Sequence, residues 1–296
     1  MLQEIARTGS YSAAGRALGY TQPAISYQMR CLEHAVGAAL AVRVGRTMAL
    51  TAAGQALLPH ADRILASIRA AEQEVSLLIG AHSGVVRLAA FPSLCATVVP
   101  AAMADVGRNM PAVTMRLVQA EPPEARELVR HGHVELAVTY RLDEPAPEPD
   151  LSPAPPRTGP LDIEPILLDE FSLILPIDHP AAHKRLIGIA ELADETWIIA
   201  SANFERRLRR AATAAGFEPR IMMVADDYVV MQALVANGLG VALLPQLALT
   251  AHHDERTVPR TLRNWPPRRV EVELWADMRR VPAVIETIEA LRTAAR

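Results

Sequence analysis

Four polar side chains on one predicted helical face are the first residues in this chain that could do chemistry. In the segment TQPAISYQMRCLE, Gln22, Ser26, Tyr27 and Arg30 lie on or near the exposed stripe of a helix. Glutamine can read adenine through two hydrogen bonds, arginine can read guanine, and serine or tyrosine can reach base edges or phosphate. These residue types therefore predict contact with DNA, and plain solvent exposure is the alternative for each of them.

Two short helices joined by a tight turn would position this face. Ser12 is the predicted N-cap of the first helix, and Gly19 falls where that helix should end, because glycine adopts the left-handed conformation without a Cβ clash. Thr21 is the predicted N-cap of the second helix, and Pro23 lies in its first turn, where a missing N–H costs little. An apolar stripe at helical spacing would bury the opposite side, formed by Ile25, Met29 and Leu32. This is the geometry of a helix-turn-helix, whose second helix enters the major groove.

The residues that follow predict a small hairpin, or wing. Two short extended runs flank a glycine, and Arg43 and Arg46 lie at the tip, where they could meet phosphates or a minor groove. An ordinary solvated turn is the alternative. Residues 1–50 hold five arginines and two glutamates, whereas the whole chain has a net charge of −3. A small basic head on a larger acidic body fits DNA contact at one end, although such an excess over fifty residues is common.

A long helix is predicted from Thr51, its N-cap, to about Ile79. Pro59 should kink its first turns, because proline removes one helical hydrogen bond. Apolar residues recur at alternating spacings of four and three, at Leu57, Ala61, Ile64, Ile68, Ala71, Val75 and Leu78. This heptad pattern predicts a coiled-coil seam between two chains. An amphipathic helix packed on its own domain is the alternative.

Short apolar runs alternate with helical patterns after a linker at Gly80–Gly84. They include one expected helix at Leu94–Arg108 and one expected strand at Ile166–Pro176, and together they predict a parallel α/β sheet. The proline-rich, acidic segment Asp143–Pro160 is expected to be a loop. Ligands of such sheets bind beyond the carboxyl ends of the strands.

The sequence lacks the residues that several classes of function require. Cys31 and Cys95 are far apart and form neither a disulfide framework nor a zinc spacing, and the histidines lie in separate segments without metal-ligand partners. There is no nucleophile motif and no dinucleotide fingerprint. We therefore expect no catalytic residues, no metal site and no cofactor. The absence of an export signal or a long apolar run favours a cytoplasmic protein.

The motifs together resemble a known family. The segments GSYSAAGRAL, TQPAISYQMRCLE and GRTMALTAAGQALLP resemble the winged helix-turn-helix of LysR-type transcriptional regulators, and LDEFSLILPIDHP and LVANGLGVALLP are typical of the family's effector domain. The resemblance covers nearly the whole chain. This chain departs from the family at Leu40-Ala41, where a Leu-Phe pair is usual, and at Tyr27, where a basic residue or histidine is common. Further helical turns would normally precede Leu2.

The resemblance implies an α/β protein with three parts. These are a winged helix-turn-helix at residues 1–56, a linker helix for dimerisation at 57–83, and an effector-binding domain at 84–296. The effector domain would have two lobes, as in periplasmic binding proteins, with lobe one at 84–160 and 267–296 and lobe two at 161–266. The implied function is a DNA-binding regulator that responds to a small molecule and forms a dimer or a tetramer. A dimeric small-molecule-binding protein with an impaired head is the alternative.

The candidate site residues fall into two sets. The expected contacts to double-stranded DNA are Ser12, Thr21, Gln22, Pro23, Ser26, Tyr27, Gln28, Arg30, Arg43 and Arg46. The expected effector contacts lie where strands end and helices begin, because free N–H groups there bind anions. They are Ser93, Gln119, Glu121, Thr139, Ser201, Asn203, Phe204 and Asp227.

Overall fold

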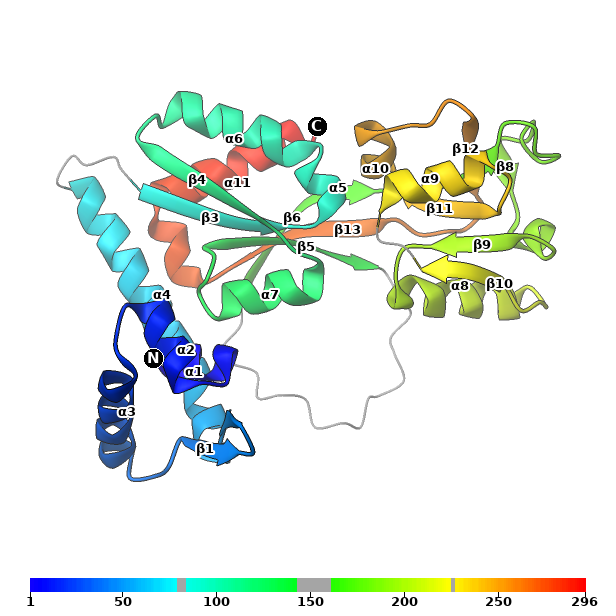
Figure 1. The fold of residues 1–296 in the computed structure, drawn as a ribbon. Coiled ribbons are helices and arrows are strands. Elements are labelled where there is room, and N and C mark those ends of the chain that lie inside the picture. The colour runs from blue at the N-terminus through cyan, green and yellow to red at the C-terminus, as the bar shows by residue number, and fades with distance from the viewer. Residues whose placement is uncertain (79–83, 143–160, 225–226) are drawn as a thin grey trace.

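A head, a long helix and a two-lobed body follow one another along the chain in the computed structural model (Figure 1). The structure describes residues 1–78, 84–142, 161–224 and 227–296. Of the expected linker at 80–84, residues 80–83 lie outside these residues and Gly84 begins a strand; the expected loop at 143–160 also lies outside them. Within the described residues, no helix is long and apolar enough to cross a membrane.

The head contains the predicted helix-turn-helix and wing. Its elements are α1 (Leu2–Thr8), α2 (Tyr11–Leu18), α3 (Gln22–Val36), β1 (Ala41–Val44) and β2 (Thr47–Leu50). Leu2, Ile5, Ala14, Ile25, Met29 and Leu40 form its buried core. Leu40 is fully buried, so it anchors the wing beside the small Ala41.

Glycine closes the turn between α2 and α3. Gly19 ends α2 with a φ of 72°, in the left-handed region predicted for it. A Cβ on Gly15 would lie 2.7 Å from the carbonyl oxygen of Tyr20, so α2 and the turn can meet only at a glycine. The predicted cap at Ser12 is wrong, because Ser10 caps α2 and its Oγ accepts a hydrogen bond from the Ala13 N–H at 3.3 Å.

The long helix α4 spans Ala52–Leu78 and begins directly after Thr51. The Thr51 Oγ1 accepts from the Gly54 N–H at 3.1 Å and donates to the Ala39 carbonyl at 2.6 Å, so the predicted cap also ties α4 to the wing. Pro59 lies inside the helix without ending it. Along the predicted seam, Ile64, Ile68 and Val75 are 60%, 49% and 55% exposed. The single chain therefore leaves these apolar side chains uncovered.

Lobe one is built on a five-stranded sheet of order β4-β3-β5-β13-β6. Its strands are β3 (Gly84–Ala90), β4 (Val113–Gln119), β5 (Leu136–Leu142), β6 (Asp162–Asp169) and β13 (Arg268–Leu274). Its helices are α5 (Pro92–Cys95), α6 (Val98–Asn109), α7 (Pro122–Arg130), η2 (Ala276–Arg280) and α11 (Pro282–Ala294). The helices α6 and α11 cover one face of the sheet, and α7 covers the other (Figure 1).

Lobe two is built on a six-stranded sheet of order β10-β9-β11-β7-β12-β8. Its strands are β7 (Phe171–Pro176), β8 (Leu186–Ile187), β9 (Thr196–Ile199), β10 (Arg220–Val224), β11 (Val241–Pro245) and β12 (Thr257–Leu262). Its helices are η1 (Ile189–Leu192), α8 (Ala202–Ala214), α9 (Tyr228–Ala236) and α10 (Gln246–Ala251). Two apolar clusters, one on each face of the sheet, form its core.

The structure of the two lobes corrects three expectations. The expected strand at Ile166–Pro176 is two strands, β6 and β7, which belong to different sheets, so lobe one extends past residue 161 to Asp169. The sheets are mixed rather than parallel: β13 runs antiparallel to β5 and β6, and β7 runs antiparallel to β11 and β12. A strand that arrives from the other lobe enters its sheet from the opposite end, which explains this direction. The expected helix at Leu94–Arg108 is divided into α5 and α6.

Candidate nucleic-acid interface and interlobe site

The exposed face of α3 carries the predicted base-reading residues. Gln22, Tyr27, Gln28 and Arg30 are exposed and Ser26 is half-buried, while Ile25 and Met29 are buried on the other side of the helix. The Gln22 Nε2 donates a hydrogen bond to the Ser26 Oγ at 2.7 Å, so these two side chains are held together on the outer face. Pro23 lies in the first turn, as predicted.

Two predicted capping hydroxyls are exposed and make no cap hydrogen bond. Thr21 occupies the N-cap position of α3, but its side chain accepts no hydrogen bond from the helix. Ser12 lies in the first turn of α2. Both hydroxyls lie on the surface of the helix-turn-helix.

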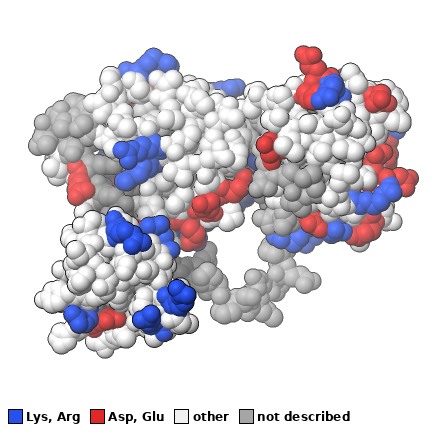
Figure 2. Space-filling model, in the orientation of Figure 1, with Lys and Arg blue, Asp and Glu red and all other residues white. Residues whose placement is uncertain are grey.

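The wing presents its arginines beside α3. Arg43 near the end of β1 and Arg46 in the turn that follows are both exposed, and the Arg43 Nε donates to the Gly45 carbonyl at 3.3 Å. Basic side chains occur at several places on the head, with few acidic ones on the face shown in Figure 2. Glu33 fixes the wing to α3, because its Oε1 accepts from the Leu40 N–H at 2.8 Å and the Ala41 N–H at 3.3 Å. The same hydrogen bonds therefore tie the exposed α3 to the start of the basic wing.

A buried arginine lies where β6, β13 and α5 meet beside lobe two. The Arg268 Nε donates to the Asp169 Oδ2 at 2.8 Å, and its Nη2 donates to the Ser93 Oγ at 2.6 Å. Its guanidinium carbon lies 4.6 Å from the ring centre of Phe91 and 4.7 Å from that of Tyr140. Ser93, predicted to touch an effector, is only 2% exposed and already binds this arginine.

Glu121 and two tyrosines line the same region. Glu121 occupies the N-cap position of α7, and its Oε2 accepts from the Tyr140 hydroxyl at 3.1 Å. Burial raises the pKa of Tyr140, and nearby Glu121 raises it further. Tyr228 comes from lobe two. Its pKa is raised by burial, and the nearby Arg268 offsets part of this rise. Both phenols are therefore neutral hydrogen-bonding groups at neutral pH.

Cys95 lies near the same region as an unreactive thiol. Burial raises its pKa to about 11, and its Sγ donates to the Ala90 carbonyl at 3.2 Å. A thiol with a raised pKa holds little of the nucleophilic thiolate at neutral pH.

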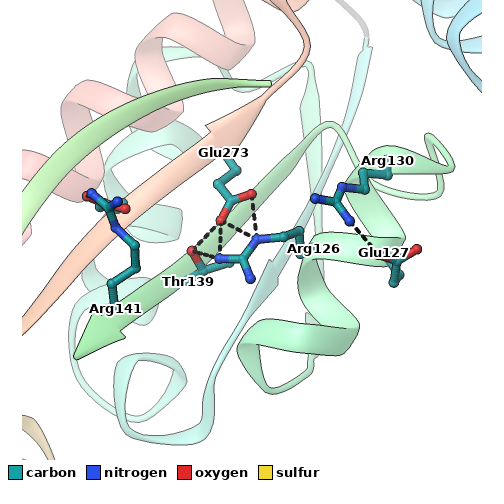
Figure 3. Close-up of polar contacts among 7 residues, drawn as sticks. Arg126, Glu127, Arg130, Thr139, Arg141 and Glu273 are labelled. Atoms are coloured by element: carbon teal, nitrogen blue, oxygen red, sulfur yellow. Dashed lines mark hydrogen bonds and ion pairs between the residues drawn. The ribbon is translucent and has the colours of Figure 1, made fainter. Parts of the chain in front are cut away.

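The predicted effector residue Thr139 belongs to a different cluster, which fixes α7 to its sheet. Thr139 is fully buried, and its Oγ1 donates to the Glu273 Oε1 at 2.7 Å. Arg126 on α7 binds the same carboxylate, with Nε at 2.8 and 3.0 Å from its two oxygens and Nη2 at 2.6 Å from Oε1 (Figure 3). Since side chains alternate along β5, Thr139 lies on the opposite face of the sheet from Tyr140.

The remaining predicted effector residues are dispersed. Ser201 caps α8 as predicted, accepting from the Phe204 N–H at 3.3 Å, and Asp227 caps α9 through the N–H groups of Val229 and Val230. Phe204 is 5% exposed and packs on Phe171 and Trp265, so it belongs to the core of lobe two. Gln119 is exposed at the end of β4. Asn203 lies in the first turn of α8, and its side chain is outside the described part of the chain.

Sequence reasoning missed Arg268 and Asp169, the most buried charged residues of this region. Asp169 lies 99 residues before Arg268 in the chain, and Ser93 lies 175 residues before it. Motifs join residues that are near one another in sequence, and no local pattern marks this pair. In the ranges that the structure describes, no three His, Cys, Asp or Glu side chains form a group that could hold a metal ion.

Two family models match the chain. The model described as "LysR substrate binding domain" matches residues 80–296, and "Bacterial regulatory helix-turn-helix protein, lysR family" matches residues 1–55. The HTH-type transcriptional regulator ShiR of Corynebacterium glutamicum (strain R) is 30% identical over 269 residues, covering 89% of this chain and 85% of ShiR. A probable nitrogen assimilation transcriptional activator of Synechococcus elongatus is 29% identical, covering 86% of this chain and 80% of that protein.

Solved structures share the fold of the whole chain. A full-length OxyR variant from Pseudomonas aeruginosa aligns with a TM-score of 0.70 at 20% identity, covering 99% of this chain and 94% of OxyR. Full-length CbnR in complex with its target DNA aligns with a TM-score of 0.54 at 22% identity, covering 100% of this chain and 97% of CbnR. At these identities the likeness concerns the fold alone.

Proposed function

This chain belongs to the LysR family of DNA-binding transcriptional regulators, and we propose that its head reads DNA through α3 while its two lobes bind a small-molecule effector that changes DNA binding. The observation that carries the proposal is the exposed polar face of α3 beside the basic wing, on a chain whose body matches the effector domain of the same family. Its relatives are transcriptional regulators, and we propose no catalytic step. Because the DNA it would bind lies in the cytoplasm, we assign it to that compartment.

The proposed DNA contacts divide between bases and backbone. Gln22, Ser26, Tyr27 and Arg30 lie on the face of α3 that would enter the major groove, where such side chains read base edges. Arg43 and Arg46 on the wing would contact phosphates beside the groove. The exposed hydroxyls of Ser12 and Thr21, together with Gln28, complete the surface as backbone contacts. The unsatisfied N–H groups in the first turn of α3, which includes Pro23, favour a phosphate.

The proposed oligomer rests on the exposed seam of α4. Ile64, Ile68 and Val75 repeat at heptad spacing and lie uncovered in the single chain. Pairing two copies of α4 would bury these side chains and would place two heads on two half-sites. We therefore propose that the functional unit contains at least a dimer, with the head at 1–56, the linker segment for dimerisation at 57–83 and the effector domain at 84–296.

The proposed effector site lies between the lobes, near Glu121, Tyr140 and Tyr228. These groups come from both lobes, so a ligand bound among them would change how the lobes sit together. The Ser93 hydroxyl would not contact the effector directly. It accepts a hydrogen bond from Arg268 and so helps to position that arginine beside the site.

Gln22→Ala is expected to weaken DNA binding about 5- to 150-fold, because it removes a bidentate base contact of about 1–3 kcal/mol and frees Ser26. Fluorescence anisotropy of the full chain on the DNA upstream of its own coding region, at fixed salt, measures this. Gln55→Ala is the matched control, because Gln55 is an exposed amide on the first turn of α4. Equal DNA affinities for Gln22→Ala and the unchanged chain would contradict the proposal that α3 reads the DNA bases.

A further inference from the structure

A buried polar cluster joins three elements that belong to the head, the long helix and lobe one. Asp62 of α4 is 3% exposed, and its Oδ1 accepts a short hydrogen bond from the Gln3 Nε2 of α1. The same Gln3 Nε2 donates to the carbonyl oxygen of His131 at 3.1 Å. The His131 Nε2 lies 3.5 Å from the Asp62 Oδ2. We call Gln3, Asp62 and His131 the three-way cluster.

Gln3 links the head to the effector domain. Within the described ranges, it is the head residue whose side chain is hydrogen bonded to the effector domain. The nearby contact between Ser67 of α4 and Asp277 of η2, at 2.8 Å, ties down the long helix but does not reach the head. The orientation of the head relative to lobe one therefore depends on Gln3, on the packing of α1 and β2 against α4, and on the packing of α4 against α7 and η2.

The other end of the same helix reaches the proposed effector site. His131 directly follows α7, and Glu121 directly precedes it. Nine helical residues separate them, which corresponds to about 14 Å. Glu121 binds the Tyr140 hydroxyl between the lobes, so one short helix spans the distance from the interlobe site to the head.

The helix is fixed to β13 and to the start of η2, so α7 and the end of that strand form one packed unit. Arg126 in its middle turn holds Glu273 with three hydrogen bonds (Figure 3), and the Trp275 Nε1 donates to the Val129 carbonyl in its last turn at 2.9 Å. A displacement at the start of such a packed unit is shared with its end, because packed elements and hydrogen-bond networks carry coupling between sites. The contacts at that end hold the buried carboxylate of Asp62, so a small shift of His131 or Gln3 that lengthens them leaves this group poorly paired and changes the hold on the head.

We propose that α7 couples the interlobe site to the DNA-binding head, with Glu121 at its start responding to the site and the three-way cluster at its end holding the head. This inference rests on the proposed effector site, because it assigns that site a path to the head. A ligand that displaces Glu121 would loosen or tighten the hold on α1 and thereby change the angle at which the head meets DNA.

Hydrogen exchange of the full chain, without any ligand, tests the coupling. Tyr140→Phe removes the hydroxyl that binds Glu121 and keeps the ring that packs on Arg268. We expect backbone exchange in residues 1–9 and 128–134 to rise about fivefold, the lower end of ordinary coupling between sites. Glu124→Gln is the matched control, because Glu124 is an exposed carboxylate in the first turn of α7, and it should leave residues 1–9 unchanged.

The reverse variant tests the same path from the head. Gln3→Met keeps the length of the side chain and removes both of its hydrogen bonds. Because coupling is reciprocal, exchange should also change in residues 119–123, at the far end of α7. Changes confined to the neighbourhood of each substitution would overturn the proposal. Since no ligand is used, a failed search for effectors would count against the effector site and not against this path.

Discussion

Replacing Gly54 with alanine is expected to abolish DNA binding while leaving the effector domain folded. A Cβ at this position would lie 2.0 Å from the carbonyl oxygen of Leu40, which α4 approaches closely as it leaves the wing. The same carbonyl accepts the Thr51 N–H at 3.0 Å, so it cannot move away without breaking the junction between the wing and α4. Overpacking of this kind costs about 1–3 kcal/mol or more, which is a large fraction of the stability of a domain this small.

Two measurements separate the head from the body in this variant. Thermal unfolding followed by circular dichroism should show an early transition for the head and an unchanged one for the lobes, and anisotropy on DNA should show no saturable binding. Gly107→Ala is the matched control: Gly107 lies inside α6 with open space around its Cα, so alanine there should be neutral or slightly stabilising. Normal DNA binding by Gly54→Ala would contradict the close packing of α4 against the wing.

Arg268→Met is expected to destabilise the effector domain by about 3–5 kcal/mol, because it leaves the buried carboxylate of Asp169 without its cation. The lost contacts to Ser93, Phe91 and Tyr140 add to this cost. Urea unfolding of the full chain, followed by fluorescence of its three tryptophans, measures the change.

A second substitution shows whether the buried charge is the cause. Asp169→Asn in the Arg268→Met background removes the uncompensated charge and keeps an acceptor for the Leu247 N–H, so most of the stability should return. Arg108→Met is the matched control, because Arg108 pairs with Asp105 on the surface of α6 and its loss should cost less than about 1 kcal/mol. Equal losses for Arg268→Met and Arg108→Met would contradict the buried ion pair.

The head could be predicted closely because its signals are local. Gly19 ends α2 and Thr51 begins α4 as the sequence indicates, since turn and cap preferences depend on neighbouring residues. The error at Ser12 has the same origin: Ser10 and Ser12 both suit a cap, and the packing of Tyr11 against the head core favours the earlier start.

The body was predicted less completely because its signals are long-range. The direction of β13 depends on the path of the chain through lobe two, which no local pattern contains. Ser93 follows β3, as an effector residue should, but Thr139 lies inside β5 and not at its end as expected; distant partners, Arg268 and Glu273, decide what each side chain does. Gln3, Asp62 and His131 carry no motif at all and are joined only by the fold.

The central claim is that this chain is a sequence-selective DNA-binding dimer, and one titration tests it most directly. The full chain is titrated onto the DNA upstream of its coding region and onto unrelated DNA of equal length at several salt concentrations, with the mass of the complex measured by sedimentation. We expect two or four chains per site, affinity that falls steeply with salt, and a preference of about 1,000-fold or more for the upstream DNA. Equal binding to both DNAs, or a complex with one chain, would contradict the account.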